Sequence, residues 1–341
     1  MQLKYNQSKE IRMLNVFIPR DCGFFSMFNW YIGLLAARPN DCIYPFLNYD
    51  IQLQLNKTCN HFCYNNKKVQ NSWMCFFKPV KFRETDRIHE QLNTTNVLQI
   101  VKQDAFTQGW DGDRSLMFFP LAEQLRKGPA TEFALWRQRI NGIFNKHIRL
   151  EDNLQNQIDE KIKMIETSLD TSLSNVIGVH FRNPSHIKEQ GVVFLRDYFH
   201  IIDGLDMNKK IYLATDFDIA VAMFKHRYGS RVYVLPGVYR TSYDTFIEWI
   251  MELKSGEMDR EGLIRGKGYD THSQIAQSKD VEDKTGMKLG YDVITDVFIL
   301  SKCKYLVNTV SNITTAVSYI NPKTELHSVQ MNEKDNKRVY S

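Results

Sequence analysis

The sequence predicts an α/β protein with two Rossmann-like domains that face each other across a cleft. The chain has 341 residues, enough for two domains at roughly 100–200 residues each. Its 43% hydrophobic and 24% charged residues are typical of a globular protein. In the second half, apolar runs of strand length alternate with segments of helical periodicity, which is typical of a parallel sheet covered by helices.

The first half is predicted to contain three buried strands followed by three helices. The first strand ends at Pro19 and leads into a turn that contains Gly23, after which a further helix is expected. The three later helices are predicted because apolar residues recur three and four positions apart. The expected strands are 13–18, 42–47 and 73–77, and the expected helices are 114–126, 131–146 and 150–169.

The second half is predicted to be a regular series of strands and helices, which means a parallel sheet. A connection rich in Gly, Lys, Asp and Ser at 255–290 interrupts the series. The change from helices to strands near 165–175 predicts two domains, 1–168 and 169–341. The expected strands are 176–181, 211–214, 231–235 and 305–307, and the expected helices are 192–202, 218–228, 292–302 and one that ends at Ile320.

Composition and charge exclude several classes of protein. The net charge of +5 is small and spread along the chain, so it demands no nucleic-acid surface and suits an anionic small molecule. No apolar stretch approaches the roughly 18 residues of a membrane span, and no signal peptide is evident, so a cytoplasmic protein is expected. The six cysteines are expected to be reduced. Cys59 and Cys63 have no second Cys or His pair at zinc spacing, so no metal site is predicted.

Candidate site residues follow the predicted strands of the second half, because open parallel sheets bind ligands beyond the carboxyl ends of their strands. The strand at 176–181 leads into Arg182, with His180 near the strand end and His186 in the loop. The planar fork of an arginine matches a phosphate bidentately. A strand-end arginine can also pair with a surface carboxylate.

Two further strand ends carry polar residues. Asp216 follows the strand at 211–214, where its carboxylate could accept N–H bonds from a guanine edge or could cap a helix. Thr309, Ser311 and Asn312 follow the strand at 305–307 and open a helix, whose N-terminal N–H groups favour a phosphate. Ser311 could also simply cap that helix. Together these residues could hold a nucleoside diphosphate without a metal ion. The chain contains no Gly-x-Gly-x-x-Gly motif at a helix start and no Walker loop, which disfavours dinucleotide oxidoreductases and P-loop enzymes.

The order of these motifs resembles that of the GT-B fucosyltransferase superfamily. The segments that carry the likeness are Ile177–Arg182 (IGVHFR), Leu213–Asp216 (LATD) and Val293–Asn312, and the last is the most specific. The likeness covers about residues 170–322. The superfamily includes α1,2- and α1,6-fucosyltransferases, rhizobial nodulation-factor fucosyltransferases and protein O-fucosyltransferases. Where that family typically has a second arginine and then an acidic residue, this chain has Asn183 to His186.

The resemblance implies a GT-B fold and an inverting, metal-independent transferase with GDP-fucose as donor substrate and no cofactor. The domain 1–168 would face a glycan acceptor, which could be lipid-linked, and 169–341 would bind the nucleotide sugar. Arg182 would bind the donor diphosphate and neutralise the leaving group, and His180 would line the nucleotide pocket. Asp216 would hold the base. Thr309, Ser311 and Asn312 would meet the phosphate.

Sugar transfer with inversion also needs a base that takes the proton of the acceptor hydroxyl. Asp21, in the turn that contains Gly23, is the best placed carboxylate of the first domain, although a turn aspartate often bonds its own backbone. His186 and Glu189 are rivals for this role.

Two alternatives remain open at this point. Asp111 with Asp113, or Asp216 with Asp218, has the spacing of metal-dependent glycosyltransferases that hold Mn²⁺ or Mg²⁺ on a diphosphate. The aromatic stretch Phe24–Tyr31 would instead suit a non-catalytic carbohydrate-binding relative, although core packing explains most of its residues better.

Overall fold

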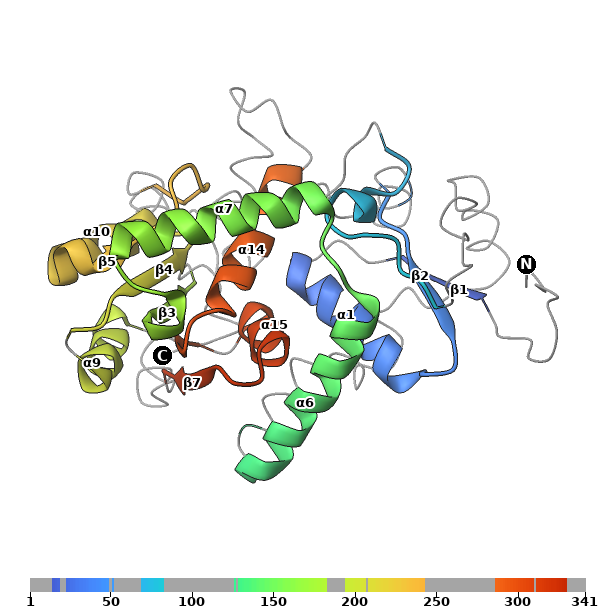
Figure 1. Ribbon diagram of the computed structural model, residues 1–341, viewed down its shortest axis with the longest axis horizontal. Helices are drawn as coiled ribbons and strands as arrows, with labels where there is room; N and C mark the ends of the chain where they lie inside the picture. The colour runs from blue at the N-terminus through green and yellow to red at the C-terminus, as the bar shows by residue number, and fades with distance from the viewer. Residues whose placement is uncertain are drawn as a thin grey trace, which may run out of the picture. The chain divides into compact units, whose positions relative to one another are not determined.

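The chain divides into two compact units in the computed structural model (Figure 1). Unit 1 comprises Met1–Asn156 and Thr285–Tyr291, and unit 2 comprises Gln157–Lys284 and Asp292–Ser341. The division falls inside helix α7 (Asp152–Leu169). The two domains expected at 1–168 and 169–341, and the cleft between them, stay predictions. The residues that the structure describes are 14–18, 23–48, 51, 69–82, 126, 128–182, 194–206, 208–242, 286–309 and 311–329.

Unit 1 begins with a strand–helix–strand crossover. β1 (Leu14–Phe17) pairs in parallel with β2 (Cys42–Pro45), with Leu14 opposite Cys42 and Phe17 opposite Pro45. Helix α1 (Phe24–Ala37) connects them and is apolar on nearly every side, as expected of a helix enclosed by its neighbours. The strands expected from the first two apolar runs are therefore confirmed. The helices α6 (Ala130–His147) and α7 also match their expected bounds closely.

Aromatic rings fill the core of unit 1. Trp73 stacks on Phe28 at 6.0 Å between ring centroids and packs against Phe77 at 4.5 Å. Phe28 also meets Phe144 of α6 edge-on at 6.3 Å. Phe24 is 4% exposed and Tyr31 is 0% exposed, so the aromatic stretch of α1 serves core packing rather than sugar stacking.

The strand expected at 73–77 is wrong, because the structure has a 3₁₀ helix, η1 (Ser72–Cys75), at this place. The cause is the side chain of Asn71. Its Oδ1 accepts hydrogen bonds from the backbone N–H of Trp73 (3.2 Å) and of Leu47 (3.0 Å), and its Nδ2 donates to the carbonyl of Pro45 (3.0 Å). Such side-chain bonds cap a turn and compete with strand pairing.

The first residues of helix α14 (Met287–Leu300) complete unit 1. Tyr291 donates a hydrogen bond to the carbonyl of Cys75 (3.1 Å), and its ring lies 5.1 Å from that of Phe76. The helix was expected to start at 292, with 287–290 in the preceding connection, so its first turn was missed.

Unit 2 is built on a sheet of five parallel strands in the order β5-β4-β3-β6-β7. The strand predictions hold for the first, second and fourth strands along the chain. The strand expected at 231–235 shortens to two residues, and the last strand was not predicted because its sequence ELHS is short and largely polar. The five strands are β3 (Ile177–Phe181), β4 (Ile211–Thr215), β5 (Val232–Tyr233), β6 (Tyr305–Asn308) and β7 (Glu325–Ser328).

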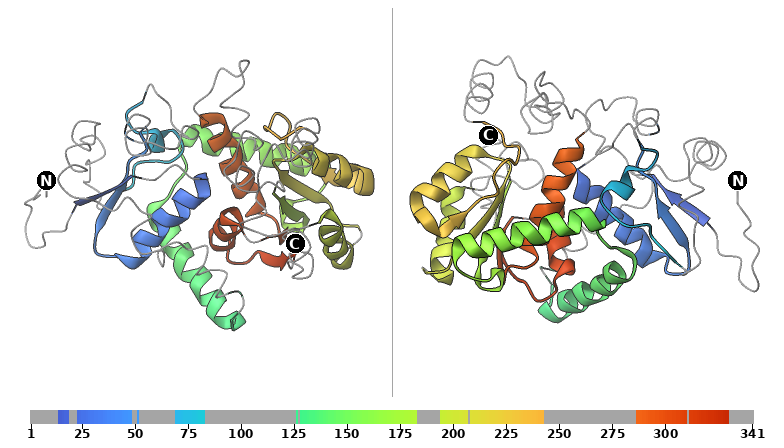
Figure 2. Two further views of the ribbon diagram at one scale, coloured as in Figure 1. Left: turned by 180° about the vertical axis from the view of Figure 1, so that it is seen from behind. Right: turned by 45° about the horizontal axis from the view of Figure 1, so that its top comes forward.

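Helices cover both faces of this sheet (Figures 1 and 2). On one face, α9 (Leu195–Leu205) and α10 (Asp218–Tyr228) pack against Val179, Phe181 and Leu213 in a buried apolar cluster. On the other face lie α14 and α15 (Asn312–Ile320). The α/β class and the parallel sheet are therefore confirmed.

Gly178 permits close packing on the second face. A Cβ at this position of β3 would lie 3.0 Å from Cδ2 of Leu300 and 3.1 Å from Cβ of Cys303. A side chain at this position would therefore require Leu300 and Cys303 to shift. Side chains alternate along a strand, so His180 lies on the same face as Gly178. No helix among the described ranges is long and apolar enough to cross a membrane.

Candidate active site

The strand order of unit 2 predicts a ligand site between β3 and β6. From β3 the chain crosses to β4 and then β5 on one side, and it returns to β6 on the other side of β3. The connections after β3 and β6 therefore run in opposite directions. In doubly wound sheets this reversal opens a crevice beyond the carboxyl ends of the two strands, which is where ligands bind.

His180 and Ser311 meet at the carboxyl ends of β3 and β6. His180 is in register with Asn308 of β6, and its Nδ1 lies 3.4 Å from Oγ of Ser311 at the start of α15. The two side chains are 5% and 3% exposed. Two candidate residues that lie far apart in the sequence are thus brought together.

Ser311 caps helix α15. Its Oγ accepts a hydrogen bond from the backbone N–H of Thr314 (3.1 Å) and lies 2.9 Å from Oγ1 of Thr314. Thr314 in turn donates its hydroxyl proton to the carbonyl of Thr309 (2.9 Å). Ser311 therefore donates to Thr314, and Nδ1–H of His180 donates to Ser311. This assignment leaves Nε2 of His180 as an acceptor.

The capping role predicted as an alternative for Ser311 is thus present in the structure, and its contact with a phosphate stays a prediction. Contacts of a phosphate with Thr309, which is 1% exposed, and with Asn312, the first residue of α15, also stay predictions. The cap orients the N-terminus of α15 toward the carboxyl end of β3, where a helix dipole favours an anion.

Tyr198 contacts the ends of both β3 and β6 from the face of the sheet that α9 covers. Its hydroxyl donates to the carbonyl of His180 (3.0 Å). It also forms hydrogen bonds with Thr309, which act to lower its pKa, although burial raises the pKa of Tyr198 overall. One buried phenol on α9 therefore holds the ends of β3 and β6 beside each other. Nothing in the sequence pattern indicates this role of Tyr198.

The imidazole of His180 is electrically neutral at physiological pH. Burial lowers its pKa from 6.5 to about 3, and the nearby positive charge of Arg182 adds to this effect. Arg182 is half-buried and follows the last residue of β3 directly. Arg182 therefore starts from the carboxyl end of β3, two residues after His180.

Asp216 lies at the next strand end. It follows β4, the neighbour of β3, and it is half-buried. Its backbone carbonyl accepts a hydrogen bond from the N–H of Thr241 (2.8 Å), so a second loop lies against it. Asp216, Arg182 and Ser311 thus follow three neighbouring strands, β4, β3 and β6.

Asn308 is a polar residue of this edge that the sequence analysis left without a role. Its side chain is 0% exposed, and Nδ2 donates to the carbonyl of Leu306 (3.0 Å). Its Oδ1 has no hydrogen-bond partner among the described residues. An unsatisfied buried acceptor costs roughly 1–3 kcal/mol, and such costs are commonly found at functional sites.

Several predicted site residues lie outside the described residues. These are the base candidates Asp21, His186 and Glu189, the acidic pair Asp111 and Asp113, and the cysteine pair Cys59 and Cys63. Their roles stay predictions. Among the described residues, no group of three or more His, Cys, Asp or Glu side chains could hold a metal ion. Asp218, the partner of Asp216 in the alternative metal site, is exposed in the first turn of α10.

This chain is similar in structure to several solved fucosyltransferases. NodZ α-1,6-fucosyltransferase soaked with GDP-fucose matches with 15% identity over 90% of this chain and 93% of that chain, at a TM-score of 0.49. Fucosyltransferase NodZ from Bradyrhizobium matches with the same identity and coverage, at a TM-score of 0.45. POFUT1 in complex with GDP-fucose matches with 10% identity over 96% of this chain and 100% of that chain, at 0.41.

No family model matches the chain, and no curated protein matches it. At identities this low a structural likeness says nothing of the reaction, so the function has to be inferred from the residues themselves.

Proposed function

We propose that this chain is an inverting glycosyltransferase that moves L-fucose from GDP-fucose to a hydroxyl group of a glycan without a metal ion. The observation that carries the proposal is the contact between His180 and Ser311 at the switch point of a doubly wound sheet, where Arg182 directly follows β3. The donor is assigned from the likeness of the three motifs to the fucosyltransferase series.

The reaction needs charge stabilisation at the leaving group. An acceptor oxygen attacks the anomeric carbon of the sugar, the bond from that carbon to the diphosphate oxygen breaks, and GDP leaves with an added negative charge. Arg182 is the cation of this site, and it balances that charge through its planar fork. The N-terminus of α15 adds its dipole to the same task.

His180 is a binding residue in this proposal and not the base. An imidazole with a pKa of about 3 holds a proton too weakly to take one from an alcohol at neutral pH. Its neutral ring places no second positive charge beside Arg182, and Nε2 can accept a hydrogen bond from a hydroxyl group of the donor. Asp21 remains the proposed base, with His186 and Glu189 as the alternatives.

A comparison of nucleotides tests the site. GDP should raise the melting temperature of the purified chain by mass action, and UDP, dTDP and CMP should raise it less. Arg182→Ala should lose most of the shift. Lys225→Ala, which removes a cation from the exposed surface of α10, is the matched control and should keep it. Equal shifts with all four nucleotides, or none, would contradict the assignment of the donor.

The transfer itself needs a second assay. Release of GDP from GDP-fucose, measured with and without an oligosaccharide acceptor, separates an active transferase from a carbohydrate-binding relative. Activity that survives EDTA supports the proposed metal independence. Activity that is lost with EDTA and restored by Mn²⁺ would favour the alternative in which a pair of aspartates holds the cation.

A further inference from the structure

The loop after β5 is joined to the segment that carries Asp216. Thr241 donates its N–H to the carbonyl of Asp216 (2.8 Å), and its own carbonyl accepts from the N–H of Asp218 (3.1 Å). Phe217 and Thr241 thereby form a parallel bridge. Thr241 is 2% exposed, so this contact is enclosed by the fold. The backbone on both sides of Phe217 is therefore hydrogen-bonded to Thr241.

Arg240, the residue before Thr241, holds this loop in place by hydrogen bonds to backbone carbonyls. Its Nε donates to the carbonyl of Thr215 (3.1 Å), the last residue of β4. Its Nη2 donates to the carbonyl of Leu235 (2.9 Å) and its Nη1 to that of Val238 (3.4 Å). One rigid guanidinium thus connects both ends of the loop to the end of β4, on the residue directly before Asp216.

Arg240 also interacts electrostatically with a buried pair, Tyr212 and Asp296. The Tyr212 side chain on β4 donates a hydrogen bond to the carboxyl of Asp296 on α14 (2.5 Å). Burial raises the pKa of Asp296 to about 7, Asp292 raises it further, and the Tyr212 hydrogen bond and the charges of Arg240 and Lys161 act to lower it. Arg240 also lowers the pKa of Tyr212 against the effect of burial. The guanidinium therefore lies close to this buried pair as well as to the loop.

We infer that Arg240 is a positioning residue of the donor site, which holds the segment around Asp216 in the orientation that binds the guanine base. The inference rests on the proposed function, because Asp216 is assigned to the base only there. Arg240 itself touches backbone carbonyls, so its contribution to the donor passes through Asp216. A lysine at this position would keep the positive charge and lose the fork that joins three carbonyls.

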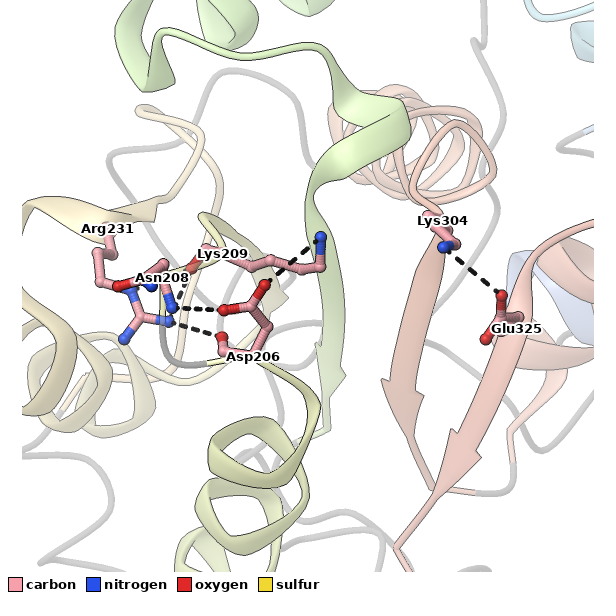
Figure 3. Close-up of polar contacts among 6 residues, drawn as sticks. All are labelled: Asp206, Asn208, Lys209, Arg231, Lys304 and Glu325. Carbon is pink, nitrogen blue, oxygen red and sulfur yellow. Dashed lines mark hydrogen bonds and ion pairs between the residues drawn. The ribbon is translucent and has the colours of Figure 1, made fainter.

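The chain contains a matched control in Arg231, just before β5. Its Nε and Nη2 donate to the carbonyl of Lys209 (3.0 and 2.7 Å), and Nη2 also donates to the carbonyl of Asp206 (3.4 Å). Figure 3 shows Arg231 beside Asp206 and Lys209. Both arginines are half-buried and make three hydrogen bonds to backbone carbonyls. Arg231 makes them at the amino ends of the strands, which is the edge of the sheet opposite the proposed site.

The experiment compares Arg240→Lys and Arg240→Ala with Arg231→Lys and Arg231→Ala in the full chain. Calorimetric titration gives Kd for GDP and for ADP, and steady-state assays with GDP-fucose give KM and kcat. Arg240→Lys should raise Kd for GDP about tenfold and Kd for ADP much less, since one well-placed hydrogen bond to a base accounts for such a factor. KM should rise with kcat nearly unchanged, because the base is remote from the reacting atoms.

Substitutions of the two arginines should have different effects on nucleotide binding and similar effects on the melting temperature. Both lysine variants should melt at lower temperature than wild type, and only Arg240→Lys should lose preference for GDP over ADP. If Arg240→Lys and Arg231→Lys keep the wild-type preference alike, Arg240 is merely structural and the inference is overturned. If the wild type itself binds GDP no better than ADP, the proposed donor is wrong and the positioning role fails with it. Arg240→Ala shows whether the loss of charge near Asp296 adds a further loss of stability.

Discussion

Replacement of His180 by asparagine should change how the stability of the chain depends on pH. His180 has a pKa of about 3 in the folded chain, whereas an ordinary histidine exposed to water has a pKa of 6.5. The unfolded chain therefore takes up a proton at this residue below pH 6.5, and the folded chain does not until about pH 3. His180 therefore has almost no effect on the free energy of unfolding above pH 6.5. It lowers that free energy progressively as the pH falls from 6.5 toward 3.

The size of this effect follows from the two pKa values. Each pH unit below the unfolded pKa costs about 1.4 kcal/mol, so His180 should lower the free energy of unfolding by about 2 kcal/mol between pH 7 and pH 5. An asparagine cannot take up this proton. Its amide can still donate to Oγ of Ser311, which His180 approaches at 3.4 Å.

Urea unfolding at pH 7 and pH 5 measures the effect. The wild type should lose about 2 kcal/mol more than His180→Asn over this interval. His147, whose pKa is lowered to about 4, is present in both proteins and cancels in the comparison. His226→Asn, at an exposed position of α10, is the control for loss of an imidazole and should follow the wild type. Equal losses for wild type and His180→Asn would refute the buried, neutral imidazole.

Three further predictions concern the site and the sheet that carries it. Arg182→Ala should lower kcat by roughly 10²–10³-fold with little change in melting temperature, since the side chain acts by charge; a measured kcat within threefold of wild type would contradict this. Gly178→Ala should lower the free energy of unfolding by about 1–3 kcal/mol in urea titrations, because its Cβ would meet Leu300 at 3.0 Å. Asp296→Asn should gain stability relative to wild type as the pH rises from about 4 to 7, because the folded pKa of about 7 lies above the unfolded value of 3.8. A constant difference across that range would show that Asp296 is already ionised in the folded chain.

The strands and helices around β3 and β4 could be predicted from the sequence because their patterns are local. A run such as Val176–Phe181 is apolar throughout, as strands buried on both faces are. The 3₁₀ helix at Trp73 could not be predicted in this way. The apolar pattern there is that of a strand, and the side chain of Asn71 changes the outcome through bonds to residues more than twenty positions away.

In the candidate site, too, some residues could be predicted from the sequence and others could not. His180, Arg182, Asp216 and Ser311 could be identified because polar residues directly after apolar strands are visible in the sequence. Tyr198 and Arg240 could not be identified, because each donates hydrogen bonds to backbone carbonyls. Every residue has a backbone carbonyl, so the sequence does not show which ones a side chain will contact. Their importance is apparent only when the carboxyl ends of β3, β4 and β6 are seen in one place.

The contact between Tyr291 and η1 has a consequence for biosynthesis. The ribosome makes the N-terminal unit first, yet the tyrosine that packs on Phe76 and bonds to Cys75 is translated only after most of the second unit has emerged. The N-terminal unit is therefore complete only once Thr285–Tyr291 has been synthesised, and a nascent chain halted before residue 285 would lack this segment. Completion of the earlier unit is thus linked to synthesis of the later one.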